Sequence, residues 1–174
     1  TVTTPTVASL TTSKALTSVD GVVGATVISP SQLIIYTISV QNTGGTSGST
    51  SVIETIPTGT LYNSTTASAE GWNCSSGYTA GKTCTQTITA TANATQTKTF
   101  TVTSLSDLGS TQSIANTITT GTGSCSNCTV TTPTVASLTT SKALTSINSV
   151  AGATTVGANQ SIVYTISVQN TGGT

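Results

Sequence analysis

One string of 18 residues, TVTTPTVASLTTSKALTS, occurs twice in this chain, at 1–18 and at 129–146. The same offset of 128 residues continues into a second shared string, YTISVQNTGGT, at 36–46 and at 164–174. Of the 46 overlapping positions 35 are identical, with 18 in the first string, 11 in the second and 6 between them. An internal repeat constrains the fold more than any other feature of a sequence. The chain therefore reads as one structural unit followed by the opening third of the next.

The repeat divides the chain into four segments. We expect a linker, or a strand from the preceding repeat, at 1–7, a complete repeat at 8–122, a linker at 123–134 and the opening strands of the next repeat at 135–174. Opening strands alone leave open sheet edges, which are templates for pairing. A neighbouring chain could complete them by strand addition, or the rest of the second repeat could follow covalently.

Composition excludes several classes of function. The chain has 4 Lys or Arg residues, 4 acidic residues and no His, so its formal net charge is zero. Nucleic-acid binding through phosphate neutralisation needs clustered cations, which this chain lacks. The commonest general base and metal ligand, histidine, is also absent. We therefore expect no enzymatic activity, no metal and no cofactor.

Threonine and serine dominate the chain, with 45 Thr and 25 Ser among 174 residues. Threonine is β-branched and suits a half-buried pleated surface. Such compositions also occur in disordered or mucin-like segments, but those lack regular alternation of apolar side chains. Here apolar residues alternate in several short runs separated by turn signals, at 6–18, 32–42, 49–59, 83–91, 97–105 and 111–120, and we expect a further short strand within 60–72. Seven or more short strands predict an all-β, immunoglobulin-like antiparallel β-sandwich.

These pieces, taken in order, resemble a known family. A lysine in the first strand is followed by YTISVQNTGGT, VIETIPTG, GWNCSSGYTAGKTC, a TxTFTVT strand and IANTITT. This order is similar to the conserved repeat called domain of unknown function eleven, over about residues 8–122. The chain departs from the family in carrying Glu54 where members more often carry Asp. The resemblance implies an immunoglobulin-like sandwich in tandem arrays on microbial cell-surface proteins, with no activity attached.

Lys14, Glu54 and Asn116 each lie between apolar residues on one face of a predicted strand. Burying an ion costs several kcal/mol, so a compensating interaction is needed. One interpretation is a buried Lys14–Glu54 ion pair whose hydrogen bonds Asn116 completes. A second is that the strand phase is wrong and Lys14 is solvated.

The third interpretation is an intramolecular isopeptide bond. Neutral Lys14 would attack the Asn116 carboxamide, ammonia would leave, and Glu54 would shuttle the protons. Burial lowers the pKa of a lysine and raises that of a glutamate, as such an attack requires. The arrangement is similar to self-formed cross-links in surface adhesin and pilin domains, where the joined residues lie on the first and last strands. Lys142 is the matching lysine of the next repeat.

The four cysteines suggest disulfides. Cys74 and Cys84 would close a loop of about ten residues, and we expect Trp72 to pack nearby in the core. Cys125 and Cys128 form a CxxC, for which we expect a local disulfide in the linker. A bridge to a neighbouring chain and a zinc site are the alternatives, although zinc lacks its further ligands here.

Five asparagines begin sequons for N-glycosylation, at Asn63, Asn73, Asn93, Asn127 and Asn159. In a chain so rich in Ser and Thr such triplets arise by chance, so the sequons permit glycosylation without showing it. Glycans would help to solubilise a surface fibre with so little charge.

Two functions fit these features. The first is a structural repeat of an extracellular filament or cell-surface stalk, stiffened by covalent links and contacting copies of itself. The second is an adhesin-type module that binds a surface, a glycan or another cell. Polymers joined end to end in micrographs would favour the first, and titratable binding by single domains would favour the second. Both place the protein outside the cell or at its surface, with no direct membrane span.

Overall fold

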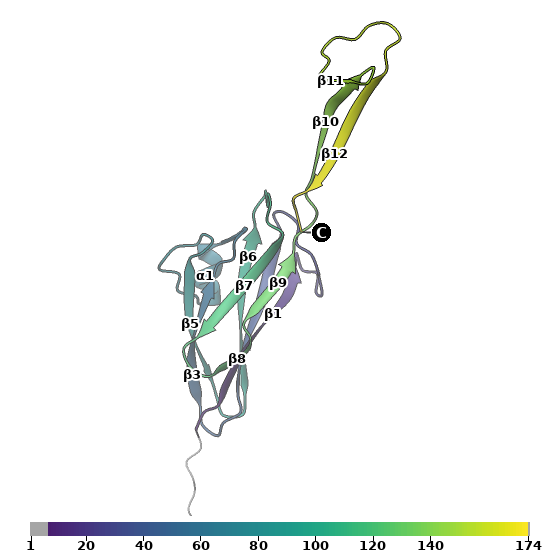
Figure 1. Cartoon of the computed structure of the whole chain (residues 1–174). Coiled ribbons are helices and arrows are strands. Elements are labelled where there is room, and N and C mark those ends of the chain that lie inside the picture. The colour runs from purple at the N-terminus through teal and green to yellow at the C-terminus, as the bar shows by residue number, and fades with distance from the viewer. Residues whose placement is uncertain (1–6, 174) are drawn as a thin grey trace, which may run out of the picture.

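The structure is a computed structural model that describes residues 7–173, drawn in Figure 1. The expected linker or strand at 1–7 therefore lies outside the described residues except for Val7. The elements are β1 (Leu10–Val19), β2 (Leu33–Asn42), β3 (Gly48–Thr55), β4 (Thr60–Tyr62), α1 (Ser64–Glu70), β5 (Thr83–Ala90), β6 (Thr95–Ser104), β7 (Ser113–Thr120), β8 (Ser124–Asn127), β9 (Thr129–Pro133), β10 (Leu138–Ile147), β11 (Val150–Ala151) and β12 (Ile162–Asn170).

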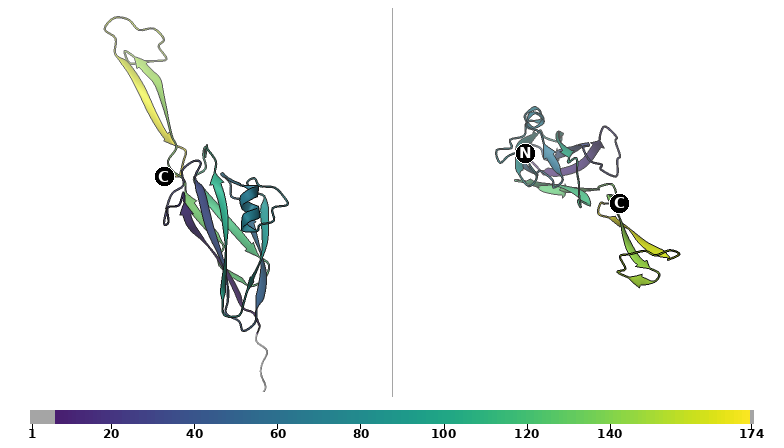
Figure 2. Two further views of the ribbon diagram at one scale, coloured as in Figure 1. Left: turned by 180° about the vertical axis from the view of Figure 1, so that it is seen from behind. Right: turned by 90° about the horizontal axis from the view of Figure 1, so that it is seen from above.

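The first nine strands form two facing sheets. One sheet has the order β4-β6-β2-β1-β8 and the other the order β5-β3-β7-β9, and every pairing within them is antiparallel except that of β8 with β1. The predicted all-β sandwich is confirmed. Figure 2 shows the sandwich from behind and from above, with α1 packed at its side.

The core lies between the sheets and follows the alternation of the sequence. On β2 the side chains of Ile34, Tyr36, Ile38 and Val40 are fully buried, as the two-residue period predicts. Each of the three aliphatic side chains contributes about 1.5–3 kcal/mol by leaving water. Strand β2 also lies in the middle of its sheet, where it is paired along one edge with β1 and along the other with β6.

The segment 123–134 is not the linker that the sequence suggested. Residues 124–127 form β8, which pairs in parallel with β1, and 129–133 form β9, which pairs antiparallel with β7. Thr132 is buried, so β9 belongs to the first sandwich although its sequence opens the second repeat. The reason is physical: without β8 and β9 the edges of β1 and β7 would be unpaired.

The segment 60–72 contains more than the short strand expected there. Strand β4 is followed by α1, whose first turn is capped by the Asn63 side chain, which accepts hydrogen bonds from the backbone N–H groups of Thr65 and Thr66. Gly71 ends the helix in the left-handed conformation, with φ 81°. The helix carries the chain from one sheet to the other.

After β9, the second repeat forms a β-hairpin that projects from one end of the sandwich, while the described chain starts at the other end (Figure 1). Strand β10 pairs with β12 in the register of β1 with β2, shifted by 128 residues, including the bulge after Leu144 that matches the one after Leu16. Among the described residues, no helix has the length and apolar character needed to cross a membrane.

Candidate functional site

Lys14 and Glu54 meet between the two sheets. Lys14 lies on β1 and Glu54 on β3, and the lysine Nζ donates to Glu54 Oε1 within an ion pair. Both side chains are shut off from solvent, with 0% exposure each. Their strands belong to different sheets, so this contact crosses the core. The sequence-based alternative of a solvated Lys14 is thereby wrong.

Asn116 is the third polar residue of this part of the core. It lies on β7, the neighbour of β3, and Ile118 on β7 is paired with Glu54. Asn116 is therefore the diagonal same-face neighbour of Glu54. Its side chain is 0% exposed. The structure thus brings the three predicted residues into one buried region.

Several buried polar atoms around the ion pair have no hydrogen-bond partner among the described residues. They include Asn116 Oδ1 and Nδ2, Glu54 Oε2 and the hydroxyl of Tyr36, whose ring lies near Lys14 Nζ. A buried polar group without a partner costs about 1–3 kcal/mol. The predicted ion pair is therefore present, but Asn116 does not complete its hydrogen bonds as the first interpretation required.

Burial shifts the ionisation of both charged groups toward their neutral forms. Loss of solvation lowers the pKa of Lys14 to about 8, although the neighbouring Glu54 opposes the shift. Loss of solvation likewise raises the pKa of Glu54 to about 7, with Lys14 opposing. Near neutral pH a proton can therefore move from the lysine to the carboxylate at small cost, which leaves an amine and a carboxylic acid.

Aromatic rings enclose the lysine. Its Nζ lies 4.9 Å from the centroid of Tyr36 and 5.6 Å from that of Phe100. Phe100 also contacts the edge of Trp72, at 5.3 Å between centroids, so the predicted packing of Trp72 in the core is seen. Both contacts of Lys14 are of the cation–π kind, in which the negative face of the ring attracts the ammonium group.

The sequence interpretation missed this aromatic enclosure and a second feature. Glu70, at the end of α1, accepts hydrogen bonds from the Tyr62 hydroxyl and from the backbone N–H and hydroxyl of Thr101. Tyr36 could have been recognised, since it is the first residue of the second shared string. Glu70 carries no local signal, because its partners come from distant strands.

The arrangement can support acyl transfer from one side chain to another. A neutral amine is a nucleophile, a carboxamide is an acyl donor, and a carboxylic acid can protonate a leaving amine. Within the described residues no group of three or more His, Cys, Asp and Glu side chains is placed to hold a metal ion.

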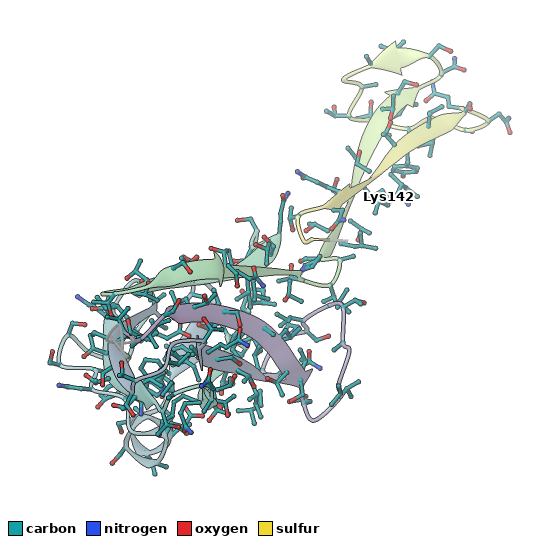
Figure 3. All side chains as sticks on the ribbon, turned by 90° about the horizontal axis from the view of Figure 1, so that it is seen from below. Lys142 is labelled. Carbon is teal, nitrogen blue, oxygen red and sulfur yellow. A yellow bond between two sulfur atoms is a disulfide. The ribbon has the colours of Figure 1, made fainter. Side chains whose placement is uncertain are left out.

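Lys142 offers a comparison with Lys14. It lies on the projecting hairpin, away from the sandwich (Figure 3), and its side chain is exposed. Its Nζ lies 4.1 Å from the centroid of the Tyr164 ring, as Lys14 lies near the matching Tyr36. The lysine–tyrosine contact therefore belongs to the hairpin itself, whereas the carboxylate and the amide are supplied by other strands.

Both cysteine pairs form disulfides. Cys74 is bonded to Cys84 as predicted. Cys125 is bonded to Cys128, so a local bridge is present, but it does not lie in a linker. It joins β8, in one sheet, to the residue before β9, in the other. It therefore cross-links the short segment by which the chain crosses from one sheet to the other.

The five sequon asparagines are all on the surface. Two of them have structural roles as well: Asn63 caps α1, and the Asn127 amide donates a hydrogen bond to the backbone carbonyl of Lys14. Asn93 and Asn159 adopt the left-handed backbone conformation, with φ 55° and 60°. Asn73 pairs with Thr85 next to the Cys74–Cys84 bridge.

Comparison with known proteins adds little. No family model matches the chain, and no curated protein is significantly similar to it in sequence. Among solved structures, the alkylpurine DNA glycosylase AlkC of Pseudomonas fluorescens, bound to DNA containing an abasic site analog, aligns with a TM-score of 0.39 and 9% identity. The alignment covers 73% of this chain and 30% of the glycosylase. So distant a likeness carries no argument about this protein.

Proposed function

We propose that the chain is a structural repeat of an extracellular filament or cell-surface stalk, and that each sandwich is locked by an isopeptide bond. The observation that carries the proposal is the passage from one unit to the next. Strand β9 closes the first sandwich and β10 opens the second, with only residues 134–137 between them. Units joined so closely act as a chain of spacers rather than as independent domains.

Two features of the sandwich suit a load-bearing role. The described chain starts at one end of the sandwich, and the hairpin of the second repeat projects from the other end (Figure 1). Tension between neighbouring units would therefore run along the strands. The disulfides Cys74–Cys84 and Cys125–Cys128 point to an oxidising location, which supports placement outside the cell or at its surface. The proposed role requires no substrate, cofactor or turnover, and the partners are further copies of the repeat.

The isopeptide bond would form in one turnover. The neutral Lys14 Nζ attacks the Asn116 side-chain carbonyl carbon while protonated Glu54 donates to the carbonyl oxygen. Glu54 then takes a proton from the attacking nitrogen and passes it to the amide nitrogen, whose bond to carbon breaks. The proton on the oxygen returns to Glu54 as the carbonyl re-forms, ammonia leaves, and a secondary amide joins β1 to β7. The reaction also removes the buried ionic charge and two unpaired N–H donors.

Intact mass tests the proposal. The chain should weigh about 17 Da less than its disulfide-bonded sequence mass, since one ammonia leaves per complete repeat. The variant Asn116→Ala should have its full sequence mass, and so should Lys14→Ala. Lys142→Ala is the matched control, because this lysine has neither partner in contact, and it should keep the deficit. Native material at full mass would refute the cross-link, and electron micrographs showing only isolated short particles would refute the filament.

A further inference from the structure

The Cys125–Cys128 bridge lies beside the two strands that the proposed cross-link joins. Strand β8 pairs with the outer edge of β1, which carries Lys14, and β9 pairs with the outer edge of β7, which carries Asn116. Cys125 belongs to β8 and Cys128 directly precedes β9, with 5.8 Å between their Cα atoms. The bridge therefore ties the neighbour of one reacting strand to the neighbour of the other.

The bridged segment also holds both reacting strands by hydrogen bonds. Asn127, inside the loop that the disulfide closes, donates from its side-chain amide to the Lys14 backbone carbonyl at 2.8 Å. The Cys128 carbonyl accepts from the backbone N–H of Ile118 at 2.9 Å. Ile118 lies two residues after Asn116, on the same buried face of β7. A segment of a few residues thus contacts the backbone of the nucleophile at one end and the strand of the acyl donor at the other.

The proposed reaction needs a geometry that this segment can set. Lys14 Nζ donates to Glu54, and the carboxamide of Asn116 has no hydrogen-bond partner among residues 7–173 that would hold it in place. An amine must come within about 3–3.5 Å of the carbonyl carbon to attack, and an error of about 1 Å can cost about 10²-fold in rate. A disulfide removes conformational freedom from the loop that it closes. It therefore limits how far β8 and β9 can move apart, and with them Lys14 and Asn116.

We propose that the Cys125–Cys128 disulfide is a positioning group for the isopeptide bond, so that cross-linking follows oxidation. The inference rests on the proposed function and deepens it by naming what regulates the site. In the first step the two thiols give two electrons and two protons to a small-molecule disulfide, which leaves as two thiols. In the second step Lys14 displaces ammonia from Asn116 with no change of oxidation state. The chain would stay unlocked in a reducing cytosol and become locked in an oxidising compartment.

The experiment follows both steps on the same molecule. The full chain with Cys74→Ala and Cys84→Ala retains only the bridge in question, and it is taken from inclusion bodies in urea, reduced and at its full sequence mass. It is then diluted into buffer with either oxidised or reduced glutathione. Iodoacetamide tags the free thiols of samples taken over time, and intact mass reports both the tags and the loss of ammonia. We expect ammonia loss to be about tenfold faster in the oxidised sample, and to occur first in untagged molecules.

Two comparisons separate positioning from stability. All samples contain trimethylamine N-oxide, which favours the folded state, and rates are expressed per folded molecule from the fluorescence of the single tryptophan, Trp72. Diiodomethane joins the two reduced thiols through one methylene group, with loss of two iodides and two protons. This bridge resists reductant and should restore the fast rate. Gly44→Ala in the same background destabilises the end of the sandwich but keeps the disulfide, and it should react at the rate of its oxidised parent.

The outcomes distinguish failure of this inference from failure of the proposed function. Equal rates per folded molecule in the oxidised and reduced samples would overturn the positioning role and leave the cross-link in place. A methylene bridge that does not restore the rate would also overturn it, and so would a Gly44→Ala chain slowed as much as the reduced chain. Ammonia loss from neither sample would refute the cross-link itself, and the positioning role with it.

Discussion

Lys14 on β1 and Glu54 on β3 form an ion pair that is enclosed between two sheets and shut off from solvent. A buried ion pair rarely repays the cost of removing two charges from water, and hydrophobic residues of similar volume are often as stabilising. This pair also has a carboxamide beside it without hydrogen bonds. The proposed cross-link would remove both charges from the core.

Glu54→Gln should block cross-linking. Glutamine keeps the size of the side chain and its hydrogen-bonding groups, but it cannot carry a proton between the two nitrogens. We expect the rate of ammonia loss to fall by roughly 10²–10⁴-fold, the usual contribution of a general acid–base group. Intact mass followed over time after refolding measures this rate. Glu54→Asp retains the carboxyl and is the matched control, which should react more slowly than the parent but still react.

The unreacted site should make stability depend on pH in two opposite ways. The pKa of Glu54 is raised from 4.5 to about 7, so the native state binds more protons between these values and the free energy of unfolding falls as pH rises through them. The pKa of Lys14 is lowered from 10.5 to about 8, so the unfolded state binds more protons there and the free energy of unfolding rises from pH 8 upward.

Asn116→Ala keeps both groups unreacted and should show this minimum near pH 7–8 in denaturant titrations. The parent chain should lack the rise above pH 8, since a lysine in an amide does not titrate. A rise of equal size in both chains would contradict the prediction.

The two disulfides should differ in their contribution to stability. In the chain-entropy treatment, a loop of about ten residues gives roughly 2.7 kcal/mol and one of about three residues roughly 1.6 kcal/mol. Cys74→Ala with Cys84→Ala should therefore lower the free energy of unfolding by about 1 kcal/mol more than Cys125→Ala with Cys128→Ala. Urea titrations of the two double variants test this order. The reverse order would show that the Cys125–Cys128 bridge between the sheets contributes more to the free energy of unfolding than its loop length predicts.

Gly44→Ala should destabilise the end of the sandwich. A Cβ there would lie 2.0 Å from the Val7 carbonyl oxygen and 2.6 Å from the Ser9 backbone nitrogen, so the backbone would have to move. Overpacking of this kind costs typically about 1–3 kcal/mol. Gly121→Ala is the matched control, because its Cβ would meet Ser51 only at an ordinary 3.5 Å. Thermal melts of the two variants should differ by several degrees, and equal melting temperatures would refute the close approach.

Much of the fold could be predicted from local patterns. The two-residue alternation identified β2 and its buried face, and the spacing of Cys74 and Cys84 identified their bridge. Helix α1 was missed, although Asn63 and Gly71 are its caps, because seven residues are too few to show a helical period. Strand β9 was missed because its string stands at the start of a repeat, and β8 was missed because it lies in the short GTGSCSNC segment just before that string, where a linker was expected.

The sequence by itself determined the repeat and predicted the sandwich, because strand alternation is a local property that each segment carries with it. It indicated inward positions for Lys14, Glu54 and Asn116 but left a solvated Lys14 open. Only the tertiary structure decided which of these residues meet and which segment closes the sheet. Contacts across the core and along the edge of β7 join residues far apart in the chain, and their partners are chosen by packing. Lys142 shows the difference: its sequence surroundings match those of Lys14, but without the facing sheet its side chain remains exposed.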